Sequence, residues 1–490
     1  MMKMLLLSLG IIALAMFVLP ENSDFILLAA PMPPLLQAPL TVCSGQAIPA
    51  GYVITAESTT TKCAATTASF NTLTLTPYTG LKSINACTPL TAPAGYLVTA
   101  QSTTAQCKGG QTGAAFNTVT LTAYNGMPKI DVCTPVTAPA GFIVTAQTLT
   151  AQCKSAQTIA TFNTVTLTAY NGMAKIDVCA PVVPPAGYLV TAQTLTAQCK
   201  SAQTTATFNT VTLTAYNGLA KIDVCTPVTP PAGYLVTAQT LTGQCKSAQT
   251  TASFDTVTLT AINGLPKINA CTPVVAPAGY LVTAQILTTQ CKSAQTTATF
   301  NTVTFTAING VPKINACTPV VAPAGYLVTA QILTNECKSA QTTATFNTVT
   351  LTAINGMAKI DACTPVAAPA GYLVTSQTLT PQCKSAQTTA TFNTVTLTAY
   401  AGMKTINACT PVASPSGFLV TAQTTSAQCK SGQVGAPFNM VTFTAYAGLA
   451  TFNACMPVAP PPGYVVAAQT RTSECTGATG ANTVTLKRVP

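Results

Sequence analysis

The stretch from Cys179 to Val224 reads CAPVVPPAGYLVTAQTLTAQCKSAQTTATFNTVTLTAYNGLAKIDV, and the segments on either side of it are near copies. Each copy opens with a cysteine and carries a second one 20 residues later. The next copy opens at Cys225, 46 residues after Cys179. Self-similarity at a fixed period is the signature of a repeat array. The chain is therefore predicted to be tandem copies of one small unit.

The 490 residues divide into an N-terminal segment, a linker and ten repeats, of which the last is shorter. Segment 1–30 is predicted to be a signal peptide or N-terminal anchor, and 31–42 a linker. The repeats are 43–86, 87–132, 133–178, 179–224, 225–270, 271–316, 317–362, 363–408, 409–454 and 455–490. The end copies depart most from the common pattern, as capping repeats do.

Composition favours strands throughout the array. The chain is 48% hydrophobic and 6% charged, so it is too apolar for a disordered linker. Its Thr, Val, Ala and Tyr content favours strands. We predict an all-β protein: a tandem array of about ten disulfide-stapled units of roughly three strands each, stacked into an elongated rod.

The spacing of the twenty cysteines predicts how they pair. Bonds between residues 20 apart use every cysteine, whereas bonds between residues 26 apart leave Cys43 and Cys475 unused. The predicted pairs are Cys43 with Cys63, Cys87 with Cys107, Cys133 with Cys153, Cys179 with Cys199, Cys225 with Cys245, Cys271 with Cys291, Cys317 with Cys337, Cys363 with Cys383, Cys409 with Cys429 and Cys455 with Cys475. Spacing alone leaves crossed bonds between neighbouring repeats open. Disulfides also imply an oxidising compartment.

One part of each repeat has the pattern of a β-hairpin. Residues 209–216 alternate strictly between polar and apolar side chains, and Asn217-Gly218, a pair typical of two-residue type I′ turns, follows. Such a hairpin sets Val211 opposite Val224 and Leu213 opposite Ile222. Alternatively, the arm after the turn completes the sheet of the next unit, and the prolines after each first cysteine mark the crossover.

Two further strand features vary from copy to copy or break the alternation. The Asn-Gly pair becomes Thr79-Gly80, Ala401-Gly402 and Ala447-Gly448 in three copies, where we expect a different turn type. Residues 234–242 form the remaining strand, after a Pro-Pro-Ala-Gly turn signal. Their poorer alternation indicates a strand buried on both faces or lying between neighbouring units.

The composition argues against an enzyme. There is no histidine, there are ten acidic residues, and the copy that begins at Cys271 has no acidic residue at all. A catalytic acid–base pair or a metal site therefore cannot recur along the array. No cofactor and no metal are predicted.

The N-terminus indicates export. Lys3 precedes the apolar run 4–19, which contains Ala13-Leu14-Ala15, a small-x-small cleavage pattern. We expect a secreted protein or one on the outer surface of a bacterium. Contact with a membrane is expected only through an uncleaved N-terminal segment.

The leading hypothesis is a non-enzymatic secreted or cell-surface structural protein: a stalk, a fibre subunit or an adhesin. Its expected partners are other copies of itself, or a cell-surface glycan or polyanion. The alternative is a multivalent array that binds a glycan or polyanion through its two lysine positions, represented by Lys200 and Lys221. No specific recognition of nucleic acid is expected. An ice-binding protein, suggested by threonines such as those of 210–214, and an outer-membrane β-barrel rank behind these.

Overall fold

The computed structural model describes residues 38–64, 69–108, 115–154, 162–200, 208–246, 254–292, 300–338, 346–384, 392–430, 437–476 and 480–489. Across these ranges the chain contains strands and no helix. The predicted N-terminal segment 1–30 and most of the linker lie outside them. The chain divides into two compact regions, one of residues 1–139 and 148–169 and the other of residues 140–147 and 170–490.

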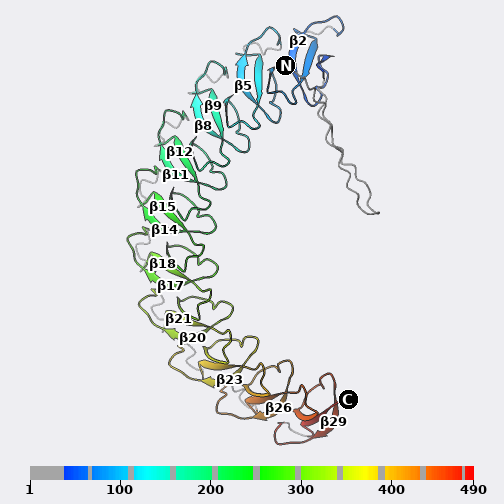
Figure 1. The fold of residues 1–490 in the computed structure, drawn as a ribbon, viewed down its shortest axis with the longest axis vertical. Helices are drawn as coiled ribbons and strands as arrows, with labels where there is room; N and C mark the ends of the chain where they lie inside the picture. The colour runs from blue at the N-terminus through cyan, green and yellow to red at the C-terminus, as the bar shows by residue number, and fades with distance from the viewer. Residues whose placement is uncertain are drawn as a thin grey trace, which may run out of the picture. The chain divides into compact units, whose positions relative to one another are not determined.

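Thirty strands of the described residues form ten three-stranded antiparallel sheets (Figure 1). The first strands are β1 (Leu40–Cys43), β4 (Ser83–Cys87), β7 (Lys129–Cys133), β10 (Lys175–Cys179), β13 (Lys221–Cys225), β16 (Lys267–Cys271), β19 (Lys313–Cys317), β22 (Lys359–Cys363), β25 (Thr405–Cys409) and β28 (Thr451–Cys455). The second strands are β2 (Tyr52–Ser58), β5 (Tyr96–Ser102), β8 (Phe142–Thr148), β11 (Tyr188–Thr194), β14 (Tyr234–Thr240), β17 (Tyr280–Ile286), β20 (Tyr326–Ile332), β23 (Tyr372–Thr378), β26 (Phe418–Thr424) and β29 (Tyr464–Thr470). The third strands are β3 (Thr72–Pro77), β6 (Thr118–Ala123), β9 (Thr164–Ala169), β12 (Thr210–Ala215), β15 (Thr256–Ala261), β18 (Thr302–Ala307), β21 (Thr348–Ala353), β24 (Thr394–Ala399), β27 (Met440–Ala445) and β30 (Thr483–Arg488). The prediction of ten disulfide-stapled, three-stranded units is confirmed.

The third strand of each sheet lies in the centre, and this overturns the predicted hairpin. β12 pairs with β10 and β11 rather than with β13, so Val211 lies opposite Val178. Val224 in turn lies opposite Val257 of β15. The predicted pair of Val211 with Val224 is therefore wrong by one whole repeat, because Val178 is the residue equivalent to Val224 in the copy before it. Near-identical copies offer the same apolar face, so matching faces set the register without selecting the copy.

The alternative connection is the one that the structure adopts: the arm after each Asn-Gly pair completes the next sheet. The chain leaves β13 at Cys225, passes through a segment that begins with a cis Thr226-Pro227 bond, and enters β14. Val228 of this segment packs on the core of the sheet. The strand Lys221–Cys225 thus spans the boundary between the sequence repeats 179–224 and 225–270. Each sheet after the first begins with the arm that ends the previous sequence repeat, and the first sheet begins with residues of the predicted linker.

The Asn-Gly turn links two sheets. The N–H of Leu219 donates to the carbonyl oxygen of Tyr216 at 3.0 Å, and Gly218 has φ of +82°. Where alanine replaces asparagine, Met403 bonds Tyr400 at the same 3.0 Å and Gly402 has φ of +78°. The hydrogen bond and the glycine φ are therefore alike in the two copies, and neither shows the expected change of turn type. Both copies keep a glycine at positive φ, and this is the residue whose conformation other side chains disfavour.

Candidate functional site: the junction between repeats

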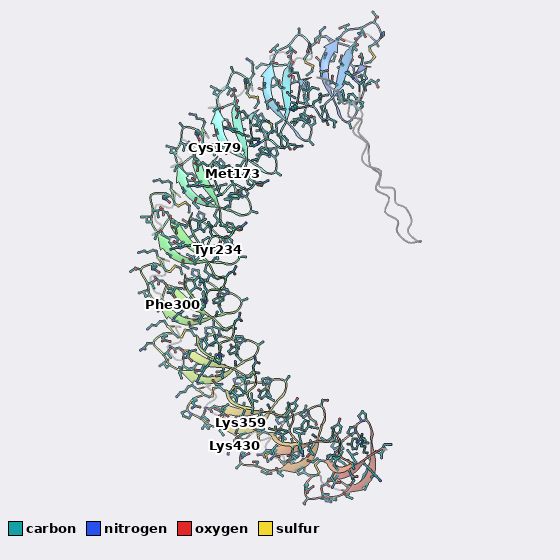
Figure 2. The ribbon with its side chains drawn as sticks, viewed as in Figure 1. Met173, Cys179, Tyr234, Phe300, Lys359 and Lys430 are labelled. Atoms are coloured by element: carbon teal, nitrogen blue, oxygen red, sulfur yellow. A yellow bond between two sulfur atoms is a disulfide. The ribbon has the colours of Figure 1, made fainter. Side chains whose placement is uncertain are left out.

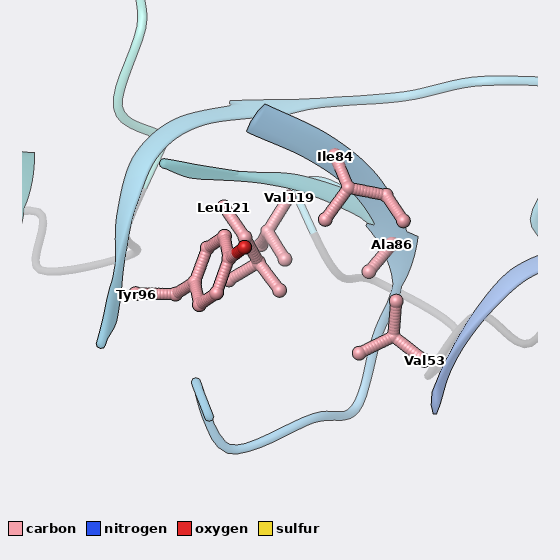
Figure 3. Close-up of a cluster of buried hydrophobic side chains, with 6 residues drawn as sticks. All are labelled: Val53, Ile84, Ala86, Tyr96, Val119 and Leu121. Atoms are coloured by element: carbon pink, nitrogen blue, oxygen red, sulfur yellow. The ribbon is translucent and has the colours of Figure 1, made fainter. Parts of the chain in front are cut away.

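A side chain from the second strand of each sheet packs into the core of the following sheet. Leu189 of β11 packs with Ile222 and Val224 of β13 and is 8% exposed. Figure 3 shows Val53 of β2 in the same role, beside Ala86 of β4. Residues in the equivalent place that belong to such clusters are Ile143, Leu235, Leu281, Leu327 and Leu373. These cores are therefore shared between neighbouring sheets, as in other repeat arrays.

A buried glutamine forms the polar part of each junction. The backbone N–H of Gln193 donates to the carbonyl oxygen of Gln244 at 2.7 Å. Its side-chain Oε1 accepts from the backbone N–H of Lys246 at 2.6 Å. Gln193 is 8% exposed, and the same two-bond arrangement recurs at Gln101, Gln147, Gln239, Gln285, Gln331 and Gln377. We call this pair of bonds the glutamine clamp.

Each disulfide attaches the loop that a clamp glutamine bonds to the first strand of that loop's own sheet. Gln244 and Lys246, the partners of Gln193, lie on either side of Cys245, which is bonded to Cys225 at the end of β13. All twenty cysteines, each within the described residues, form the predicted bonds between residues 20 apart. Each bond therefore fixes a clamp loop to its own sheet, so the disulfide framework positions the junction as well as stabilising the unit.

The loop around the second cysteine of each repeat is also bonded by a side-chain amide that directly precedes the central strand. In the repeat that begins at Cys179 this amide belongs to Asn209, and the loop is the one around Cys199. Asn209 accepts from the N–H of Thr196 at 2.8 Å through Oδ1. Its Nδ2 donates to the carbonyl oxygens of Thr196 at 2.8 Å and Cys199 at 2.5 Å. The amide therefore bonds one donor and two acceptors of the loop backbone.

One repeat carries an aspartate in place of this asparagine. Asp255 Oδ1 accepts from the N–H of Thr242 at 2.8 Å, as the asparagines do in other repeats. A carboxylate has no N–H to offer to the carbonyl oxygens of Thr242 and Cys245, which are equivalent to those that Asn209 bonds. This loop lacks two hydrogen bonds that its neighbours have.

Both predicted lysine positions lie on the surface, at opposite ends of the first strand. Lys175 begins β10, and Lys200 follows the cysteine that is bonded to the last residue of that strand. Both are exposed. Four residue steps separate Lys175 from Cys179, about 13 Å in a strand. Lys359 and Lys430, one from each position, are labelled in Figure 2.

The first two threonines of the central strand β12 are buried and hydrogen-bonded inside the unit, and the third, Thr214, is partly exposed and bonds Thr191. Thr210 and Thr212 are 4% and 6% exposed. Thr212 donates to Asp177 Oδ1 at 2.6 Å, and the hydroxyls of Thr210 and Thr196 lie 2.6 Å apart. An open Thr-x-Thr surface of the kind that binds ice is therefore not formed by these residues.

Six central copies carry a strongly exposed leucine directly after the second strand. They are Leu149, Leu195, Leu241, Leu287, Leu333 and Leu379, all 70–72% exposed. The equivalent residues of the end copies are Thr59, Thr103, Thr425 and Arg471. Single exposed apolar side chains are common on protein surfaces, so this row alone does not identify a binding site.

The clamp and its apolar neighbour are the residues that the sequence analysis did not single out. Leu189 and Gln193 lie in a strand whose poor alternation predicted either burial on both faces or a position between neighbouring units, and their contacts with the next sheet match the second alternative. The alternation was the available signal. A strand whose residues contact two sheets does not divide into one apolar and one polar face.

The described residues hold no group of three or more His, Cys, Asp or Glu side chains placed to bind a metal ion. In the same part of the chain, no helix has the length and apolarity to cross a membrane. Comparisons with protein-family models, with curated proteins and with solved structures found no match.

Proposed function

We propose that this chain is a non-enzymatic structural protein of the extracellular space or cell surface, which acts as a stalk, a fibre subunit or an adhesin. The observation that carries the proposal is the junction: the same apolar contact and the same glutamine clamp join one repeat to the next. The recurrence of the same contacts between successive repeats is typical of a protein whose function is structural.

The disulfides support the location. Ten bonds per chain are compatible with an extracellular protein, since reducing compartments keep thiols reduced. Export through the N-terminal segment is part of the proposal. Sequencing the N-terminus of protein recovered outside the cell tests it, because a mature chain that begins between residues 16 and 43 is expected.

The second candidate is a polyanion-binding array, and the exposed lysines favour it. Lysines at the position of Lys200 recur in eight copies, from Lys108 to Lys430, and all are exposed. The net charge of +11 has the sign that attracts acidic polysaccharides. Weak sites of this kind gain affinity only by acting together.

One experiment separates the two candidates. The full chain and in-frame deletions of residues 225–270 and 225–316 are tested against a panel of glycans and polyanions at physiological salt. A structural role predicts no binding that depends on repeat number. Affinity that climbs steeply with each added repeat and falls with salt would replace the structural role with the binding array.

A further inference from the structure

The first and last sheets in the chain expose residues equivalent to those that form the junctions between the other repeats. Val465 of β29 is the residue equivalent to Leu189 and is 50% exposed, whereas Leu189 is 8% exposed. Gln469, equivalent to the clamp residue Gln193, is also exposed. The last sheet thus presents an apolar side chain and a clamp glutamine on one strand.

The first sheet presents the complementary surface. Leu40 of β1 is equivalent to Ile176, which packs against the incoming Ile143 in the cluster of its own sheet. Leu40 is 39% exposed and Ile176 is 6% exposed. Lys62 and Ala64, on either side of Cys63, are equivalent to the residues that a clamp glutamine bonds, and both are exposed.

We propose that the β29 face of one chain docks on the β1 face of a second copy, repeating the internal junction between chains. Val465 enters the core beside Leu40, the N–H of Gln469 donates to the carbonyl oxygen of Lys62, and its Oε1 accepts from the N–H of Ala64. The argument is continuity with an interface already present along the chain. It rests on the proposed structural function, of which it names the partner and the contact.

The contact is heterologous, because each chain uses a different surface at its two ends. Heterologous contacts join subunits head to tail and leave one free surface of each kind on every product, unless the assembly closes into a ring. The expected product is therefore a series of linear oligomers whose mean mass rises with concentration.

Two variants of the full chain each remove one half of the contact. Val465→Asp and Leu40→Asp place a charge on a side chain that is 50% or 39% exposed in the single chain, so each chain is expected to fold. Burying that charge in the contact is costly. For each variant alone, the affinity of one chain for another should fall by at least about 100-fold. Leu195→Asp, which changes a 71% exposed leucine away from both faces, is the matched control and should associate like the unmodified chain.

Mixing the two variants supplies the decisive measurement. Val465→Asp retains an intact β1 face and Leu40→Asp retains an intact β29 face, so an equimolar mixture should form a one-to-one dimer and nothing larger. Sedimentation velocity measures the masses of each variant and of the mixture. A mixture that stays monomeric, or an unmodified chain that stays monomeric up to about 1 mM, overturns the proposed contact.

The outcomes of this experiment and of the ligand panel are independent. A monomeric chain removes the head-to-tail contact but leaves a single-chain stalk in place. Binding that depends on repeat number removes the structural function, while the mass distribution of the ligand-free chain is unaffected.

Discussion

At the scale of single residues, side-chain amides bond backbone groups of the loops. Asn209 bonds a loop of its own sheet, and Gln193 bonds a loop of the following sheet. The asparagine uses both its donor and its acceptor, which is why it suits its place better than aspartate, whereas the glutamine side chain acts in the clamp as an acceptor through Oε1. The two exceptions, Asp255 and Glu57, test this view from inside the chain.

Asp255→Asn should stabilise its loop. The new Nδ2 can donate to the carbonyl oxygens of Thr242 and Cys245, and satisfying such groups is worth about 1 kcal/mol per bond. Slower hydrogen exchange in residues 242–246 is the expected result. Asn209→Asp is the mirror control and should speed exchange in residues 196–200. Equal exchange rates in both comparisons would show that the amide donor contributes nothing.

Gln193→Leu should weaken the junction that Gln193 forms. The N–H of Lys246 loses this part-buried hydrogen bond, and a bond of this kind contributes about 0.5 to 1.5 kcal/mol. Gln193→Glu is the control, since Glu57 holds the equivalent N–H of Lys108 with a carboxylate oxygen. Exchange of the Lys246 amide should rise in the leucine variant and stay close to the unmodified rate in the glutamate variant. Similar rates in all three proteins would refute the clamp.

At the scale of elements, the Asn-Gly turn connects two sheets, and its geometry does not depend on asparagine at the position before the glycine. The Leu219 to Tyr216 bond and the positive φ of Gly218 define it, and the Ala401 copy keeps both features. Glycine is the residue that this turn requires, since side chains disfavour a φ of +82°.

Gly218→Val should destabilise the turn and the sheets on either side, because a β-branched residue at positive φ is strained by roughly 1 to 3 kcal/mol. Asn217→Ala should leave stability within about 0.5 kcal/mol, as Ala401 indicates. Hydrogen exchange of the Leu219 amide distinguishes the two variants. Strong destabilisation by Asn217→Ala would mean that the asparagine side chain has a role that the backbone geometry does not reveal.

At the scale of the molecule, each sheet shares its core with its neighbour in sequence, so damage should stay local. Replacing Cys271 and Cys291 by serine removes one disulfide and the constraint that it places on a 20-residue separation. The chain-entropy model gives about 3 kcal/mol for a loop of this size. Faster exchange is expected in β16 to β18 and in the sheets that adjoin them.

Distant sheets, such as β4 to β6, provide the internal control in the same sample and should exchange as before. A single cooperative loss of protection along the whole chain would contradict nearest-neighbour coupling. Non-reducing peptide mapping of the unmodified protein should recover the ten bonds between residues 20 apart, which checks the starting material.

The sequence by itself determined the features that depend on short-range pattern. Cysteine parity selected the pairing of Cys179 with Cys199, alternation located the strand 210–215, and Asn217-Gly218 marked a tight turn. The strand and the turn follow from residues within one repeat, whereas the cysteine pairing follows from the spacing of the cysteines along the whole chain.

Only the tertiary structure decided which copy supplies each partner. Val178 and Val224 are the same residue in successive repeats, and both match the apolar face of Val211 equally well. The chain connection between strands selects Val178, because the turn carries Val224 onward to β15 of the next sheet. The clamp of Gln193 was equally hidden, since its partners lie in another repeat. In an array of near-identical units, local pattern fixes the register, and the packing of one unit against the next fixes the partner.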